Sequence, residues 1–144
     1  MGDDDCLKLE NQLCFPLYAC SKEIVRRYRP FLDELDLTYP QYITMLALWE
    51  YGPMSVKDLG SKLYLDSGTL TPLLNKLEDK GYVSRRRGEK DWKLVIISLT
   101  DEGVRLKEKA RKVPGSIGAC IPLDAADAAE LYRILRKLMS DLGD

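Results

Sequence analysis

The chain of 144 residues is long enough for one domain with a substantial core and too short for two domains of ordinary size. Its 45% hydrophobic and 31% charged residues are typical of a soluble globular protein, and no apolar run approaches the roughly 20 residues that span a bilayer. Residues 1–5 are acidic where a secretory signal is basic and then apolar, so the sequence predicts a cytoplasmic protein without a membrane segment.

Charge is distributed unevenly, although the net charge is only −1. Residues 55–93 contain 9 basic and 6 acidic side chains, whereas residues 1–54 contain 5 basic and 9 acidic ones. A basic segment of this kind favours contact with nucleic acid. An ordinary solvated surface can carry the same charge, so the motifs have to decide between the two interpretations.

The chain has four cysteines, Cys6, Cys14, Cys20 and Cys120, and no histidine. A cytoplasmic location disfavours a structural disulfide framework, and the absence of histidine and of a Cys-x-x-Cys pair disfavours zinc. The absence of histidine also excludes Cys-His and Ser-His-Asp hydrolases. We therefore predict no metal, no cofactor and no enzyme activity, and cysteines that are either inert or redox-active.

Residues 7–32 have apolar side chains at near-helical spacing, which predicts a first helix that ends around Pro30. Pro16 interrupts this pattern. Because proline fits a helix best in its first turn, either the main helix begins near Phe15 or the helix is kinked there. In the first case Cys14 lies at a helix N-terminus, where the dipole favours a thiolate.

Two helices are expected next. One runs from Tyr39 to about Tyr51 and is apolar around most of its circumference, so it should be buried. The other follows the cap Ser55 and ends near Leu63. A tight turn then leads into a third helix that begins at a cap and ends before Gly81, and this order is typical of a helix-turn-helix.

The third helix is amphipathic. Either Asp66 or Ser67 is a good N-cap. The inward stripe consists of Leu70, Leu73, Leu74 and Leu77. The other face carries short donors and acceptors and a cation, which suit base edges and phosphates. The strands Tyr82–Arg86 and Lys93–Leu99 follow, around a loop at residues 87–92 that forms a candidate wing. The predicted DNA-binding residues are Ser67, Thr69, Thr71, Asn75, Lys76, Arg86, Arg87, Lys90 and Lys93.

The C-terminal part reads as two helices. Thr100 caps a helix that continues to Val113, residues 114–118 break the chain, and Asp124 precedes the last helix. The apolar stripe of that helix comprises Leu131, Ile134, Leu135, Leu138, Met139 and Leu142. Such a stripe commonly packs on its own core, but a winged helix-turn-helix does not need long end helices, so we expect them to form a dimer interface.

The predicted fold is mainly α with a small β-hairpin wing, as a single domain over residues 1–144. A winged helix-turn-helix over 39–99 is flanked by dimerisation helices within 7–32 and 101–142. A two-fold homodimer would place two recognition helices about 34–36 Å apart, on a pseudo-palindromic site in double-stranded DNA.

The order of elements and residues 67–81, Ser-Gly-Thr-Leu-Thr-Pro-Leu-Leu-Asn-Lys-Leu-Glu-Asp-Lys-Gly, resemble the MarR family of dimeric winged-helix repressors over nearly the whole chain. Residues 9–19, Leu-Glu-Asn-Gln-Leu-Cys-Phe-Pro-Leu-Tyr-Ala, resemble the start of its OhrR branch, the organic-hydroperoxide sensors, and two-cysteine members in particular. The resemblance implies that Cys14 reacts with peroxide, that Tyr28 and Tyr39 hydrogen-bond it, and that Cys120 of the partner subunit resolves it.

Helix geometry constrains this implied site. Tyr28 lies 14 residues beyond Cys14, so on one helix the two are about 21 Å apart. A contact between them must therefore come from two subunits, which would place the redox site on the dimer interface. Oxidation there would shift the helices and release DNA.

The chain departs from the family pattern in two places. Pro16 replaces a usual alanine, which puts the helix geometry beside the reactive thiol in question. The wing carries Asp91-Trp92-Lys93 where many members have Asp-x-Arg, so Arg86, Arg87 or Lys90 is the alternative minor-groove residue.

Other interpretations stay open. Cys6 and Cys20 are further candidates for the resolving thiol, although both are expected to be inert. The chain could also be a MarR-type repressor that a small aromatic or phenolic ligand releases, with structural cysteines. A thiol peroxidase using Cys14 is the least favoured, because it leaves the basic helix and wing without a purpose.

Overall fold

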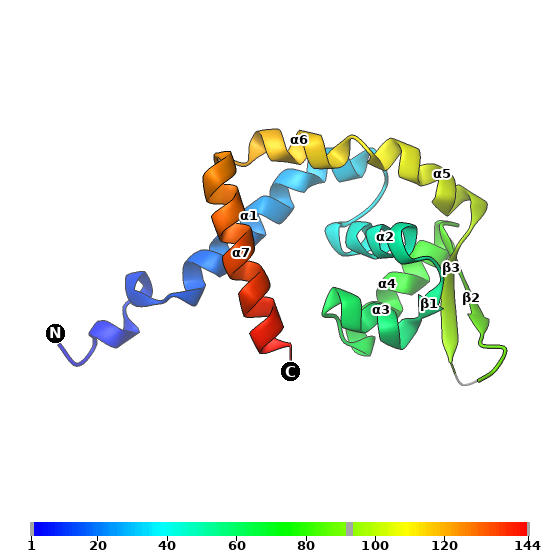
Figure 1. Cartoon of the computed structure of the whole chain (residues 1–144), viewed down its shortest axis with the longest axis horizontal. Helices are drawn as coiled ribbons and strands as arrows, with labels where there is room; N and C mark the ends of the chain where they lie inside the picture. The colour runs from blue at the N-terminus through cyan, green and yellow to red at the C-terminus, as the bar shows by residue number, and fades with distance from the viewer. Residues whose placement is uncertain (1, 92–93, 144) are drawn as a thin grey trace.

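The computed structural model of the chain describes residues 2–91 and 94–143 and is mainly helical, with a small three-stranded antiparallel sheet. In Figure 1, α2, α3, α4 and the sheet form one body, while α1, α6 and α7 extend to its side. The predicted fold class is confirmed. The elements in chain order are η1 (Asp5–Leu7), η2 (Leu9–Asn11), α1 (Cys14–Asp33), α2 (Tyr39–Tyr51), β1 (Met54–Ser55), α3 (Val56–Leu63), α4 (Ser67–Asp79), β2 (Val83–Arg87), β3 (Val95–Leu99), α5 (Asp101–Ala110), α6 (Val113–Cys120) and α7 (Ala125–Leu142).

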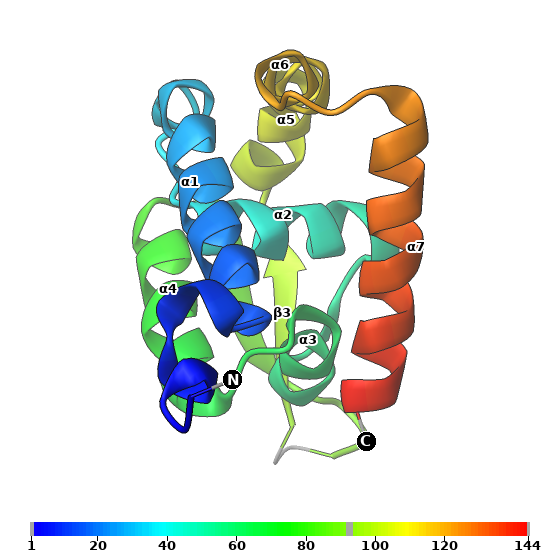
Figure 2. The same cartoon turned by 90° about the vertical axis from the view of Figure 1, so that its left-hand side faces the viewer.

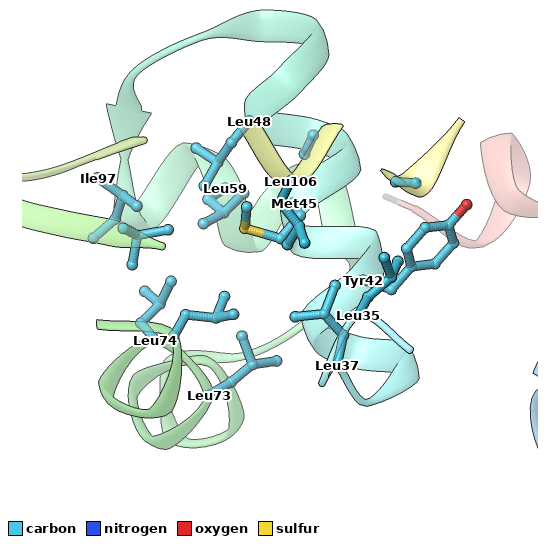
Figure 3. Packing of buried hydrophobic residues seen from close by; sticks show 14 of the residues in the cluster. Leu35, Leu37, Tyr42, Met45, Leu48, Leu59, Leu73, Leu74, Ile97 and Leu106 are labelled. Atoms are coloured by element: carbon cyan, nitrogen blue, oxygen red, sulfur yellow. The ribbon is translucent and has the colours of Figure 1, made fainter. Parts of the chain in front are cut away.

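The core lies between α2, α3, α4 and the sheet. Figure 3 shows leucines of α4 pointing into the same space as Met45, Leu48 and Ile97. All four leucines of the predicted α4 stripe are buried, as expected. Each fully buried leucine contributes about 1.5–3 kcal/mol relative to exposure, so α4 has one strongly preferred rotation. That rotation turns its polar face outward.

Local caps set the ends of the helices. The Asp66 side chain accepts a hydrogen bond from Thr69 N at 2.7 Å, so Asp66 is the N-cap of α4. Ser55 and Thr100 cap α3 and α5 in the same way, as predicted. Beyond α4, Gly81 has φ +84°, a left-handed conformation that favours glycine.

The sheet has the order β1-β3-β2, and β1 was not predicted. β2 pairs with β3 from Val83↔Leu99 to Arg87↔Val95, so these strands begin and end within two residues of the predicted limits. β1 pairs Met54 with Ile97. Two residues are too few to show strand alternation, which is why the sequence pattern missed β1.

The first helix differs from its predicted limits at both ends. It begins at Cys14, in agreement with the alternative that places the helix start near Phe15, and residues 5–11 form two short 3-10 turns instead. It also continues through Pro30 to Asp33. Leu32, which is 2% exposed, anchors the last turn in the core, and this burial offsets the backbone hydrogen bond that Pro30 cannot make.

The predicted break at residues 114–118 is wrong. These residues belong to α6, so three helices instead of two follow the hairpin. Pro114 lies in the first turn of α6, where a missing N–H is not needed. Val113 and Ile117, about one turn apart, are both buried, and α6 packs against α1.

Candidate nucleic-acid interface and thiol site

The polar face of α4 is exposed as predicted. The leucines beneath it fix its orientation, and the turn that joins α3 to α4 is built on Tyr64, which has a left-handed φ of +57°. The exposed residues of the predicted set on this helix are Ser67, Thr69, Thr71, Asn75 and Lys76. They present hydroxyls, one amide and one ammonium, which are the groups that contact phosphates and base edges.

Arg85 on β2 ties the wing to α4, and sequence analysis missed this role. Its guanidinium donates to Asn75 Oδ1 and lies 3.5 Å from Glu78 Oε1. Because the amide oxygen of Asn75 is engaged, its NH₂ group is the part left to donate outward. Asn75 therefore suits an acceptor such as guanine O6 or thymine O4.

The hairpin places further cations beside α4. Arg86 and Arg87, at the end of β2, and Lys90, in the loop, are exposed as predicted. Gly88 N donates to Leu94 O at 2.9 Å and closes the loop. The predicted residue Lys93 lies outside the described residues. The described part of the wing thus carries three cations that could enter a groove of DNA.

Cys14 is the first residue of α1 and its side chain is exposed. Leu13 occupies the N-cap and makes no side-chain cap hydrogen bond, so the first backbone N–H groups have no side-chain acceptor there. Pro16, in the first turn, needs no hydrogen-bond acceptor. The arrangement is that expected for a thiol at an uncapped helix N-terminus.

Tyr28 and Tyr39 form a ring pair with centroids 4.9 Å apart, and Tyr42 extends it into a cluster that sequence analysis missed. Burial, followed by the proximity of Tyr39 and Tyr42, raises the pKa of Tyr28 to about 12. Burial also raises the pKa of Tyr39. These phenols therefore stay protonated at neutral pH and can donate a hydrogen bond to an anion.

Cys120, the last residue of α6, is exposed and lies beside α1. Its carbonyl oxygen accepts a hydrogen bond from Arg27 Nη1 at 2.6 Å. Arg27 is 13 residues, or about 20 Å along the helix, from Cys14. Within one chain the structure therefore brings neither Tyr28 nor Cys120 to Cys14, and the predicted redox residues form an incomplete site.

α1 and α7 have exposed apolar side chains. Figure 2 shows these helices standing apart, and a groove of about 540 Å³ lies between them. No residue from Ala125 to Leu142 is buried, and the stripe residues Leu131 and Leu138 are 41% and 40% exposed. The groove is lined by Pro16, Leu17, Cys20, Ser21, Ile24, Val25, Tyr39, Leu131 and Leu135.

Residues 2–91 and 94–143 contain neither a metal-ligand cluster nor a helix suited to span a membrane. No cluster of three or more carboxylate or thiol side chains there could hold a metal ion. In the same ranges no helix combines the length and apolarity that crossing a membrane requires.

Comparison with known sequences identifies relatives of the whole chain. Residues 26–110 match the family described as transcriptional regulator SarA/Rot. The chain is 49% identical over 138 residues to the organic hydroperoxide resistance transcriptional regulator of Bacillus subtilis, covering 96% of this chain and 94% of that protein. These relatives are transcriptional regulators rather than enzymes, in agreement with the prediction from the sequence.

Solved structures agree with this relationship. Reduced AbfR bound to DNA, a Staphylococcus epidermidis protein, has a TM-score of 0.80 at 35% identity, over 98% of this chain and 96% of that one. Disulfide-formed AbfR has a TM-score of 0.65 at 37% identity, over 94% and 96%. The reduced form of MarR from E. coli shares the fold, with a TM-score of 0.71 at 24% identity over 89% and 96%.

Proposed function

This chain belongs to the MarR family of winged-helix transcriptional regulators, to its OhrR type, and we propose that it is a homodimeric repressor that releases DNA when an organic hydroperoxide oxidises Cys14. The observation that carries this proposal is the division of the thiol site. Cys14 and the Tyr28–Tyr39 pair lie far apart in one chain, and both α1 and α7 have exposed apolar side chains.

A second copy of the chain is the occupant that suits the groove between α1 and α7. Its own α1 and α7 carry matching apolar faces, so a two-fold contact would bury both. The same contact can bring Cys14 of one subunit to the Tyr28–Tyr39 pair of the other. Two copies of α4 would then face successive major grooves of a pseudo-palindromic operator.

In the proposed dimer, the sulfur of reduced Cys14 faces the two tyrosine hydroxyls of the partner subunit. Tyr28 and Tyr39 donate hydrogen bonds to Cys14 across the interface, and burial, which raises the pKa of both phenols, favours this protonated form further. The start of α1, where no cap side chain hydrogen-bonds the backbone, adds a favourable helix dipole. The tyrosines thereby link the oxidation state of the Cys14 sulfur to the positions of the end of α1 and the start of α2.

The proposed reaction has two steps. The Cys14 thiolate attacks one oxygen of the hydroperoxide, the O–O bond breaks, and a sulfenic acid forms while the alkoxide leaves and takes a proton as alcohol. The thiol of Cys120 of the partner subunit then attacks the sulfenic sulfur, which forms the S–S bond and releases water. Cellular thiols supply the two electrons that restore both cysteines.

Oxidation removes the acceptor of the tyrosine hydroxyls and pulls α1 toward the partner's α6, which changes the spacing of the two α4 helices. The shape of the chain supports assigning it to the DNA-binding state. It is more similar to AbfR in the reduced, DNA-bound form than in the disulfide form, with TM-scores of 0.80 and 0.65.

One observation favours a second candidate effector. A groove of about 470 Å³ beside α2 and α5 is lined by two aromatic side chains, Tyr42 and Trp49, by two cations, Lys107 and Arg111, and by one carboxylate, Glu50. This chemistry fits an aromatic carboxylate. Release by such a ligand would survive Cys14→Ser, whereas release by a hydroperoxide would not.

The deciding experiment measures DNA binding by the reduced protein before and after one equivalent of cumene hydroperoxide. The fragment is the DNA upstream of the protein's own gene, and non-reducing gels follow the disulfide. We expect reversible loss of binding and a cross-linked dimer band, both abolished by Cys14→Ser. Cys120→Ser should lose the cross-linked dimer band but still release DNA after oxidation. Cys20→Ser serves as the matched control. DNA affinity that does not change after peroxide treatment would reject the redox mechanism.

A further inference from the structure

The connection between α1 and α2, residues 34–38, is held by the segment that leaves α4. Lys80, the first residue after α4, donates to the carbonyl oxygen of Asp36 and to Gln41 Oε1 at 3.0 Å. Two residues later, the Tyr82 hydroxyl donates to the carbonyl oxygen of Leu35 at 3.5 Å. The residues that follow α4 are thus hydrogen-bonded to a segment that lies about 40 residues earlier in the sequence.

The acceptors of Lys80 are themselves fixed. Gln41 is 3% exposed, and its Oε1 also accepts the Thr38 N–H at 3.0 Å, which completes the capping box of α2. Asp36 has a left-handed φ of +55° and lies between two buried leucines, Leu35 and Leu37. The connection is therefore anchored in the core. If it moves, the oxygen atoms that accept hydrogen bonds from Lys80 move with it.

The same connection joins the two tyrosines of the thiol site. Tyr28 lies on α1, less than two turns before its end, and Tyr39 is the first residue of α2, next to the capping residue Thr38. Their rings are 4.9 Å apart. Any displacement of one ring relative to the other is thus imposed on residues 34–38, which lie between them in the chain.

We propose that Lys80 is a positioning residue that transmits the state of the Tyr28–Tyr39 pair to the recognition helix α4. This inference rests on the function proposed above. A shift of the connection between α1 and α2 moves the two oxygen acceptors of Lys80, and the end of α4 follows. Lys80 is a cation of the basic segment, but its ammonium is committed to Asp36 and Gln41 and not to a phosphate.

The strength of this link lies in its hydrogen bonds. The Asp36 carboxylate lies 3.7 Å from Lys80 Nζ but is 80% exposed, so this ion pair contributes little. The carbonyl of Asp36 and the buried amide of Gln41 accept charge-assisted hydrogen bonds from a side chain that is only 25% exposed. Removing the ammonium should therefore release α4 from the connection.

The test compares Lys80→Met with Lys76→Met, a lysine one turn earlier on the exposed face of α4. Operator affinity is measured for reduced and hydroperoxide-oxidised protein over a series of salt concentrations. In Lys80→Met we expect the ratio of reduced to oxidised affinity to fall by about 3- to 30-fold, with the salt slope of the wild type. Lys76→Met should show a shallower salt slope and an unchanged ratio.

Gln41→Met provides a second variant, because it removes the acceptor and leaves the lysine. It should reduce the ratio in the same direction, and the double variant should lose no more than the stronger single one. Lys80→Arg, which keeps a donor, should restore most of the ratio. Thermal unfolding confirms that each variant is folded.

The outcomes separate the two hypotheses. A wild-type protein that keeps its DNA after oxidation rejects the proposed function, and the coupling with it. A wild-type protein that releases DNA, together with a Lys80→Met variant that keeps the full ratio, overturns the coupling alone. A salt slope that falls in Lys80→Met as it does in Lys76→Met would instead make Lys80 a phosphate contact.

Discussion

The ring of Tyr28 lies 4.9 Å from the ring of Tyr39 and is tilted by 56° against it, so the end of α1 is packed directly on the start of α2. Both side chains are only partly exposed, and burial raises the pKa of each. A neutral phenol is the stable form of both side chains in this environment. The pair therefore combines a packing role with the ability to donate hydrogen bonds.

Alkaline pH should destabilise the fold through Tyr28. In the unfolded chain its phenol ionises near pH 10, whereas in the folded chain the pKa is about 12. The unfolded state thus loses the proton first, so stabilisation is complete below pH 10 and is lost as the pH rises through 12. Urea unfolding across this range should show a shallower decline for Tyr28→Phe than for the wild type. Tyr132→Phe, at an exposed site on α7, serves as the matched control for the removal of a phenol hydroxyl.

A charge in the stripe of α7 should prevent dimerisation without unfolding the chain. Leu138 is 40% exposed in the single chain, so Leu138→Glu removes little of its own core. Against a partner's apolar face the carboxylate would be desolvated at a cost of several kcal/mol. Sedimentation should show a monomer that retains helical circular dichroism. Lys137→Gln makes the same change in net charge on an exposed position and should remain dimeric, and a dimeric Leu138→Glu would argue against an interface at this stripe.

A methyl group at Gly103 should be costly. Trp49 Nε1 donates to the Gly103 carbonyl at 2.9 Å, and an added Cβ would lie 2.1 Å from the carbonyl oxygen of Tyr82. Gly103→Ala should therefore lower the free energy of unfolding by about 3 kcal/mol through overpacking. Gly115→Ala in α6, where a Cβ meets nothing within 4 Å, should raise it by about 0.5–1 kcal/mol. Equal melting temperatures for the two variants would contradict this.

Arg27 should hold the end of α6 in place. Its hydrogen bond to the Cys120 carbonyl is exposed. We therefore expect this bond to contribute about 1 kcal/mol to the local stability of α6, less than is usual for a charged donor. In Arg27→Met, hydrogen exchange at residues 118–121 should be about 5-fold faster. Arg26→Met, which breaks only the exposed pair with Glu23, should not change exchange there. Equal exchange in both variants would assign no role to Arg27.

The parts of the fold that the sequence predicted are those that depend on neighbouring residues. The leucine stripe of α4 and the cap at Asp66 are local, and both appear as expected. β1 depends on Ile97, 43 residues beyond Met54, and could not be recognised from two residues. Glycine and proline at residues 114–118 predict a break, but Pro114 lies in the first turn of α6, and the burial of Ile117, which stabilises the helix, depends on the rest of the fold.

The same difference between local and long-range contacts determines which functional residues the sequence predicts. The exposed face of α4 followed from its periodicity. The roles of Arg85 and Lys80 did not, since their partners Asn75 and Gln41 are fixed only by the folded arrangement. Cations in a basic segment look alike in the sequence, and only their contacts separate those that face outward from those that brace α4.

The length of α1 has a genetic consequence. Because Cys14 and Cys120 of one chain are held at separate places along that helix, neither Cys14→Ser nor Cys120→Ser homodimers can form the cross-link. A cell that expresses both mutant alleles would assemble mixed dimers, in which Cys14 from one allele meets Cys120 from the other. Co-expression of two alleles that cannot cross-link on their own would thus restore one cross-link in each mixed dimer.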